Sequence, residues 1–456
     1  MLMWCASGVV MLFVHYPELD EGHRVQALAP IDWRGCCQFP PVAASQPIAN
    51  ASVEALAGTP MLRLEPEGGP PAMFDLRTGA PVTKVGQDVA EAVAAGYGPL
   101  DELRIVDRDQ WTVSGEFNPH RPLYKVALAD RARTEIYVSS KTGEAVQATT
   151  GAGRFWNWLG SVPHWLYPTL LRSHPAVWTQ MVIWTSLLGC FLTATGLYVG
   201  WAAFRPFGDR RWSGYRRVWL WHHLAGLVFG VLTLTWVASG LVSMNPWGFL
   251  EGSGGSAARA RLQGPHPTWA QVRDAISGLA AHPPAGPTLR VSTAPFGGKL
   301  YLVSAGLGGQ LVRHDGAGAP ISLSAADLAD AARRLADGRT ISSATVVTRQ
   351  DAYYFSHHST VRLPAYRLIL KGGERDYLDP RTGQLLARFD ADARGYRWLH
   401  EGLHRWDFVP GARQGPVWAA VMVLLLSGVT LGVGAGVWLS WKAALRDLRR
   451  LTRRRR

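Results

Sequence analysis

The chain has 456 residues, 47% of them apolar, and a formal net charge of +13. The positive charge is concentrated in two stretches: residues 205–217 hold five Arg and one Asp, and residues 442–456 hold one Lys, seven Arg and one Asp. Because both stretches flank long uncharged runs, they follow the positive-inside pattern of membrane proteins. This distribution argues against nucleic-acid binding and places both stretches in the cytoplasm.

Residues 1–16 are interpreted as a first membrane helix that is too short. Their apolar run ends at Val14, whereas a helix needs roughly 20 apolar residues to cross a bilayer. The segment Trp4–Val10 closely matches Trp236–Val242, in a later apolar run. This match predicts that residues 1–16 correspond to the second half of a complete helix. We expect either that the sequence begins too late or that this copy has lost its first half.

The stretch 17–153 reads as a soluble α+β domain, with a predicted helix at 87–95, a strand at 123–128 and a hairpin over 135–146. An interfacial segment, 154–175, follows it. The uncharged run 176–204 is then predicted to be the second membrane helix.

The third membrane helix is predicted at 218–247, after the cytoplasmic loop 205–217. It contains no Asp, Glu, Lys or Arg, and its only ionisable side chains are His222 and His223. An imidazole within a membrane segment is costly unless it has a partner, so both are candidate ligands. The alternative is two interfacial histidines above a packing seam formed by glycines.

A second soluble stretch, 248–393, repeats the order of the first. Its predicted elements are helices at 268–279 and 325–335 and strands at 299–304 and 366–370. After it come an interfacial segment at 394–415, the fourth membrane helix at 416–441 and the cytoplasmic tail at 442–456.

The two halves of the chain match at several points, which indicates a tandem duplication. Residues 121–128 correspond to 363–370, and the turn at 141–143 corresponds to that at 381–383. The predicted fold is therefore a membrane protein with a four-helix transmembrane bundle and two α+β domains. With both basic stretches in the cytoplasm, the two domains face the other side, which is the periplasm of a Gram-negative cell.

The duplication also aligns two histidines near the membrane surface. His164 follows Trp158 by six residues, and His404 follows Trp398 by six. Histidines at matching depth on two related helices can bind one metal ion from opposite sides, and His400, one helical turn before His404, can join them. The alternative is that they are interfacial residues beside tryptophans.

The two groups of histidines lie at different depths, because His223 and Pro246 are separated by roughly 34 Å of helix, close to the thickness of a bilayer core. Two imidazoles on one haem leave no open iron position, which suits electron transfer. The sequence has no C-x-x-C-H motif for covalent haem, and no carboxylate cluster accompanies these histidines. One haem at each level would form an electron path across the membrane.

The soluble stretches give weaker signals. Tyr354, His357 and His358 lie in a run of aromatic and histidine residues and are candidate substrate contacts. The alternative is that the histidines are exposed loop residues without a role. Walker loops, G-x-G-x-x-G and nucleophile motifs are absent, which disfavours ATPase and hydrolase activities.

Several segments resemble the PepSY-associated transmembrane proteins, also called iron-regulated membrane proteins. They are Trp221–Leu227, Trp236–Gly240, Ser243–Trp247, Asp351–His358 and Trp398–His404. The resemblance implies two PepSY-like periplasmic domains and a likeness to bacterial siderophore-iron reductases, which hold two b-type haems in four helices. It implies a multi-pass protein of the bacterial inner membrane that reduces a ferric chelate. The missing half of the first helix puts the cytoplasmic haem of this chain in doubt.

Two functions are therefore compared. The first is a haem b oxidoreductase that passes electrons from an unknown electron donor, through the lipid bilayer, to a periplasmic ferric chelate such as a ferric siderophore. It would use His164 and His404 at one level and His222 or His223 at the other. The second is a non-enzymatic membrane scaffold or regulatory module whose PepSY domains bind a peptide or protein partner.

Overall fold

The computed structural model describes residues 1–204, 213–357, 361–408, 413 and 415–454. Contacts divide the chain into two compact units, each described by itself. The membrane unit comprises Met1–Tyr16, Gly153–Glu251 and Asp392–Arg456, and the sheet unit comprises Pro17–Ala152 and Gly252–Ala391. Each unit thus takes segments from both halves of the duplicated sequence.

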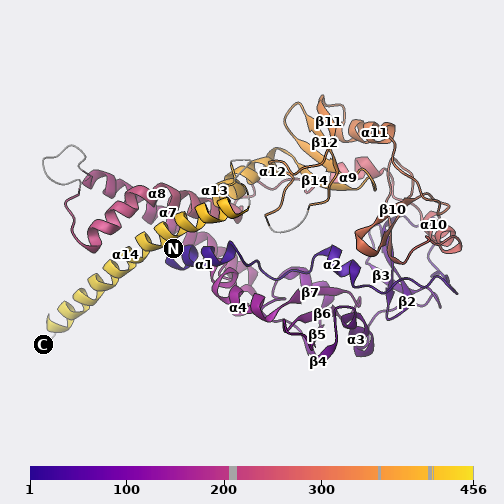
Figure 1. Cartoon of the computed structure of the whole chain (residues 1–456), viewed down its shortest axis with the longest axis horizontal. Helices are drawn as coiled ribbons and strands as arrows, with labels where there is room; N and C mark the ends of the chain where they lie inside the picture. The colour runs from indigo at the N-terminus through magenta and orange to yellow at the C-terminus, as the bar shows by residue number, and fades with distance from the viewer. Residues whose placement is uncertain (205–212, 358–360, 409–412, 414, 455–456) are drawn as a thin grey trace. The chain divides into compact units, whose positions relative to one another are not determined.

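Three long apolar helices dominate the membrane unit: α7 (Pro175–Ala203), α8 (Val218–Ser243) and α14 (Pro416–Arg454). Each is long and apolar enough to cross a membrane, and α8 contacts both α7 and α14 (Figure 1). The helix α14 continues beyond the predicted end at residue 441. It does so because the basic tail consists mainly of Arg, Leu and Ala, which favour helix.

The first of the four predicted membrane helices is short in the structure, as the sequence indicates. Helix α1 (Leu2–Met11) has 10 residues, or about 15 Å of length, which is half of a bilayer core of about 30 Å. It nevertheless packs with α8 and α14 in one apolar cluster, whose buried members are Cys5, Leu232, Trp236, Trp418, Met422, Leu426 and Val429. The described residues therefore contain three helices of spanning length, and a fourth, short one that packs against two of them.

Glycines bring α8 and α14 close together. A β-carbon at Gly432 would lie 2.9 Å from Ala225, and one at Gly436 would lie 2.8 Å from the ring of His222. Because real β-carbons do not approach so closely, these two positions require glycine for the observed packing. The consequence is that His222 lies directly against the backbone of α14.

In the part of the chain that the structure describes, short helices precede α7 and α14: α4 (Gly151–Leu159), α5 (Ser161–His164) and α6 (Thr169–Arg172) before α7, and α12 (Ala391–Tyr396), η3 (Arg397–Gly402) and α13 (Leu403–Arg405) before α14. The element η3 is a π-helix. Such wide turns are rare and occur frequently at functional sites.

The sheet unit contains three antiparallel sheets. Its strands are β1 (Ile48–Leu56), β2 (Thr59–Pro66), β3 (Ala72–Asp75), β4 (Leu100–Val106), β5 (Leu123–Leu128), β6 (Glu135–Ser139), β7 (Ala145–Thr149), β8 (Thr288–Thr293), β9 (Leu302–Gly306), β10 (Leu311–His314), β11 (Ile341–Val347), β12 (Ala365–Leu370), β13 (Arg375–Leu378) and β14 (Leu385–Phe389). The strand orders are β4-β5-β6-β7, β11-β12-β13-β14 and β10-β9-β8-β1-β2-β3.

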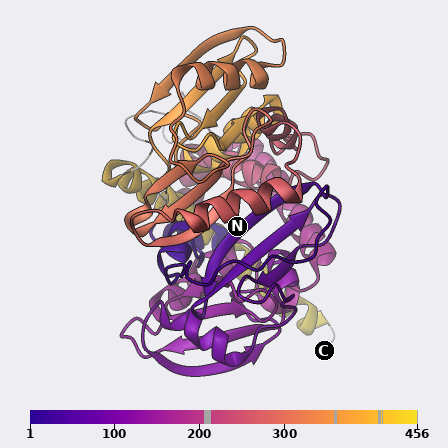
Figure 2. The same ribbon diagram turned by 90° about the vertical axis from the view of Figure 1, so that its right-hand side faces the viewer.

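Amphipathic helices cover these sheets. Helices α3 (Gln87–Ala95), α10 (Trp269–Ala281) and α11 (Ala325–Ala336) agree closely with the predicted helices. Ala90 and Ala94 of α3 pack on the β4–β7 sheet, and α10 packs on the six-stranded sheet (Figure 2). The smaller helices are α2 (Glu21–Gln26), α9 (Ser256–Gln263), η1 (Gly115–His120) and η2 (Leu307–Gly309).

The six-stranded sheet joins the two soluble stretches. Strand β1 of the first stretch pairs with β8 of the second, with Val53 opposite Val291 and Glu54 opposite Arg290. The sequence predicts two separate α+β domains, but this pairing makes one continuous sheet from both. The repeat is preserved at the level of contacts, because Tyr137 donates a hydrogen bond to Asp109 and Tyr377 donates one to Asp351.

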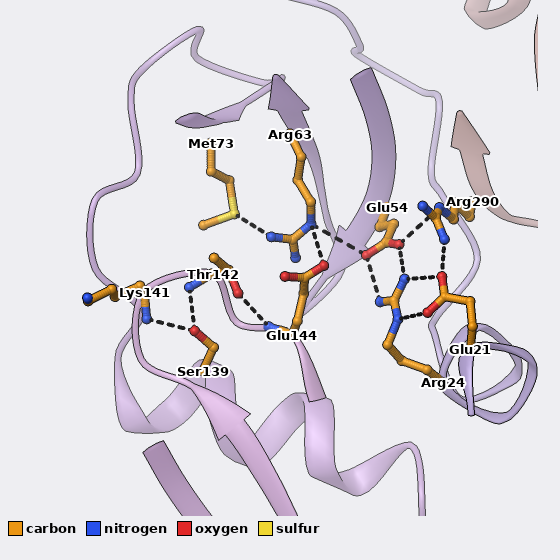
Figure 3. A network of polar contacts seen from close by, with 10 residues as sticks. All are labelled: Glu21, Arg24, Glu54, Arg63, Met73, Ser139, Lys141, Thr142, Glu144 and Arg290. Atoms are coloured by element: carbon orange, nitrogen blue, oxygen red, sulfur yellow. Dashed lines mark hydrogen bonds and ion pairs between the residues drawn. The ribbon is translucent and has the colours of Figure 1, made fainter. Parts of the chain in front are cut away.

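A buried ion cluster lies on the same sheet beside the β1–β8 pair (Figure 3). The carboxylate of Glu54 is 3% exposed and accepts two hydrogen bonds from Arg24, at 2.6 and 3.1 Å. Arg290 and Arg63 lie 3.4 and 3.6 Å from the same carboxylate, and Arg24 also binds Glu21. The cluster thus connects α2, β1, β2 and β8.

Candidate metal centre

His164 and His404 come together in the membrane unit, as the sequence predicts. His164 ends α5 and His404 lies on α13, and their ring centroids are 6.0 Å apart with 79° between the ring planes. Two imidazoles on opposite sides of one metal ion, each with a metal–nitrogen bond of about 2 Å, have centroids about 6 Å apart. The separation therefore fits two axial ligands of one ion.

Each of these rings is oriented by the helix beside it. Nδ1 of His164 donates to the carbonyl of Trp4 at 3.0 Å, and the Ser7 hydroxyl lies 3.1 Å from the same nitrogen. Because a carbonyl only accepts, the proton is on Nδ1 and the lone pair is on Nε2. This is the tautomer of a metal-ligating histidine with an outer hydrogen bond.

His404 has the corresponding partners on α8. Its Nδ1 lies 3.0 Å from the hydroxyl of Ser239, which itself donates to the carbonyl of Trp236 at 3.0 Å. A β-carbon at Gly240 would lie 3.8 Å from Cε1 of His404, and one at Gly8 would lie 3.6 Å from Cε1 of His164. The repeated Trp-x-x-Ser-Gly pattern therefore forms two equivalent cradles, one for each histidine.

Tryptophans fix the segments that carry the two histidines. The indole of Trp178 donates to the carbonyl of Trp165 at 3.0 Å, 13 residues earlier, and the indole of Trp418 donates to the carbonyl of Arg405 at 2.8 Å, also 13 residues earlier. Trp165 and Arg405 directly follow His164 and His404. The duplication has thus kept the link from each histidine to the long helix after it.

Both rings are held neutral by their surroundings. Burial lowers the pKa of His164 to about 4, and burial together with nearby His400 and His164 lowers the pKa of His404 well below its ordinary value. A neutral imidazole is the form that binds a metal ion. The site therefore presents two deprotonated Nε2 atoms around neutral pH.

His400 lies one turn before His404 on η3. Its ring centroid is 5.4 Å from that of His404, and its Nδ1 donates to the carbonyl of Ser239 at 2.9 Å. Burial lowers the pKa of His400 to about 4. His400 is therefore a third neutral imidazole beside His164 and His404. The residue that corresponds to His164 in the duplicated sequence is His404.

The two histidines of α8 differ in their contacts. Nδ1 of His222 donates to the carbonyl of Gly432 on α14 at 2.9 Å. Both nitrogens of His223 are engaged, Nε2 by the carbonyl of Gly200 at 2.8 Å and Nδ1 by the Ser213 hydroxyl at 2.7 Å. Among the described residues, Nε2 of His222 has no hydrogen-bond partner, whereas His223 links α7 to the start of α8.

The donor set fits a haem better than a bare metal ion. Within the described residues there is no group of three or more His, Cys, Asp or Glu that could hold a metal. A porphyrin supplies four nitrogens itself and needs only two axial ligands from the protein. Two neighbouring neutral imidazoles can meet that need, whereas a structural zinc site requires four protein ligands.

Two of the three candidate substrate contacts, Tyr354 and His357, lie in the segment between β11 and β12 of the sheet unit. Tyr354 is 8% exposed, stacks on Tyr377 at 4.7 Å and donates its hydroxyl hydrogen to the carbonyl of Arg362. His357 packs edge-on against Phe355. His358 lies outside the described residues. The buried position of Tyr354 suits a core side chain.

The serine contacts give a direct prediction. Replacing Ser239 by alanine removes the hydroxyl beside Nδ1 of His404, and loss of an outer-shell partner typically weakens metal binding about 10- to 100-fold. We expect the Ser239→Ala variant to release bound haem about tenfold faster to apomyoglobin, a haem acceptor, in detergent. Ser243→Ala, which removes a hydroxyl that donates to the carbonyl of Gly240 on the same helix, is the matched control. Equal rates of haem release from the two variants would contradict the proposed role of the Ser239 hydroxyl.

Comparison with known proteins identifies a family. The family model described as the PepSY-associated TM region matches residues 38–307, which is more than half of the chain. The searches of curated proteins and of solved structures found no match to the chain.

Proposed function

Since the chain belongs to the family of the PepSY-associated TM region, we propose that it is a haem b oxidoreductase of the bacterial inner membrane. It would pass electrons across the bilayer to a periplasmic Fe(III) chelate such as a ferric siderophore. The observation that supports this most is the half-buried pair His164 and His404, with ring centroids 6.0 Å apart.

The residues of the chain would divide the work as follows. His164 and His404 would hold the outer haem, while Ser7, Ser239 and the carbonyl of Trp4 keep the two rings in the ligating tautomer. A haem with two imidazole ligands supplies one-electron redox chemistry at an iron without an open position. Such a centre favours electron transfer over oxygen activation.

His222 would serve the inner level. It lies 17 residues before Ser239 on α8, or about 26 Å along the helix axis. A single helix would therefore carry a ligand for one level and the cradle for the other. The sheet unit, in this proposal, lies on the periplasmic side, where the chelate would be met; the electron donor would act from the cytoplasmic side.

His222 and His223 should respond differently to substitution. We expect His222→Ala to lower the haem content and His223→Ala to leave it unchanged, because both nitrogens of His223 are already hydrogen-bonded within the chain. Haem would be quantified by absorbance per mole of purified protein. Equal losses of haem in the two variants would contradict the assignment of His222, and not His223, as the ligand.

The proposal is tested by the reduced-minus-oxidised visible spectrum of the purified chain, expressed with adequate haem supply. A sharp α-band typical of low-spin b-type haem is expected, as is its reoxidation by a ferric chelate. A chain that folds and binds no haem would instead favour a scaffold that binds a peptide or protein partner.

A further inference from the structure

A hollow lies where α8 begins and where α14 leaves the apolar run. It encloses about 370 Å³ and is lined by Trp219, Leu439, Lys442, Leu445, Arg446 and Arg449. This hollow is formed entirely within the membrane unit. It lies on the far side of His222 from the paired histidines, since Trp219 precedes His222 by three residues on α8 and Ser239 follows it by 17. The proposed electron path uses none of these six side chains.

Its cationic side chains share one face of α14. Lys442, Arg446 and Arg449 follow one another at intervals of four and three residues, a spacing that places them in one row along a helix. Among the residues that the structure describes, no acidic side chain lines the hollow. The nearest acidic residue in the sequence, Asp447, lies 4.0 Å from Arg450, which does not line the hollow. Within the described part of the chain, the positive charge of this row is therefore not offset by a carboxylate in the hollow.

The row also starts at the level of a membrane interface. Trp441 is the last residue of the uncharged run, and the ammonium group of Lys442 lies 4.7 Å from the ring centre of Trp438. Across the hollow, Trp219 is 50% exposed and stacks on Tyr215. Aromatic side chains of this kind gather at the headgroup level of bilayers. The lining is thus apolar at one end and cationic at the other.

We propose that this hollow binds the phosphodiester headgroup of an anionic phospholipid. The guanidinium groups of Arg446 and Arg449 can each form paired hydrogen bonds to phosphate oxygens. Trp219 and Leu439 offer an apolar surface for the first part of an acyl chain. A soluble phosphate would use only the cationic end, whereas a phospholipid matches both the charge and the apolar lining.

The test is native mass spectrometry of the full chain in detergent, with phosphatidylglycerol or zwitterionic phosphatidylcholine added at equal concentration. We expect phosphatidylglycerol to be retained preferentially. Arg446→Gln should weaken that retention about fivefold, the effect of one basic residue at an anionic surface. Arg450→Gln, which removes the same charge one turn further along the helix, should change it much less. Arg449→Gln provides an independent second variant of the lining.

Three results would overturn the proposal. Equal retention of the two lipids would mean that the headgroup charge is not recognised. Equal losses in Arg446→Gln and Arg450→Gln would mean that the attraction comes from the tail as a whole. Displacement of phosphatidylglycerol by millimolar inorganic phosphate would mean that the hollow binds a soluble anion. Because the substituted side chains are exposed, α14 is expected to remain helical in each variant. Circular dichroism checks this.

Discussion

Replacing either His164 or His404 by alanine is expected to remove one haem per chain and to leave the long helices intact. The two rings lie 6.0 Å apart, and a haem that loses one of two axial imidazoles loses its low-spin spectrum and most of its hold on the protein. Haem per chain, from absorbance, and helix content, from circular dichroism, measure both parts of the prediction.

Two variants control this experiment. His174→Ala removes an exposed histidine from the same segment and should keep all the haem. Its Nδ1 contacts the carbonyl of Leu170 and the hydroxyl of Ser173, both close by in the sequence. His404→Gln keeps a polar side chain of similar length, so a loss of haem there reports a lost ligand and not a cavity. Full haem content in both His164→Ala and His404→Ala would contradict the pairing.

Replacing Glu54 by alanine is expected to destabilise the sheet unit by about 3–5 kcal/mol, the usual cost of breaking a buried ion pair. The substitution would leave Arg24 buried, with Glu21 as its remaining partner. Arg63 and Arg290 would each lose one of two carboxylates and keep Glu144 and Glu21, respectively. Urea unfolding followed by the β-sheet signal of circular dichroism measures the change. Glu102→Gln, in an exposed pair with Arg104, should change little.

The same carboxylate predicts an acid transition. Burial alone would raise the pKa of Glu54, but hydrogen bonds and charges from Arg24, then Arg63 and Arg290, lower it to about 2 from its ordinary value of 4.5. Its contribution to stability is therefore complete above pH 4.5 and is lost as the pH falls towards 2, a loss of about 3 kcal/mol. Glu54→Gln should abolish this part of the acid dependence; an unchanged acid transition would contradict it.

The sequence predicted the membrane helices and the helices of the sheet unit because their signals are local. Uncharged runs mark α7 and α8 within a few residues, and amphipathic periodicity marks α3 and α11. The pairing of β1 with β8 was not predicted, since strands more than 200 residues apart carry no local sign of their partner. That one pairing turns the two expected domains into a single sheet unit.

Only part of the candidate metal centre was predicted, because contacts between helices leave no local sign in the sequence. Duplication identified His164 and His404, but the roles of Ser7 and Ser239 follow only from the packing of α1 and α8. The repeated Trp-x-x-Ser-Gly pattern contained that signal, although it indicated only that the two helices are related. His222 and His223 could not be distinguished in sequence. Adjacent helical residues differ in direction by about 100°, so one contacts α14 and the other contacts α7.

The most direct test of the account is electron transfer across a sealed membrane. Vesicles containing the purified haem-loaded chain would enclose a membrane-impermeant reductant, with a ferric chelate and an iron(II)-specific chromogenic chelator outside. The account predicts external Fe(II) that depends on the chain and falls to the level of empty vesicles with His404→Ala. Formation of Fe(II) at the same rate with wild type, His404→Ala and empty vesicles would contradict it.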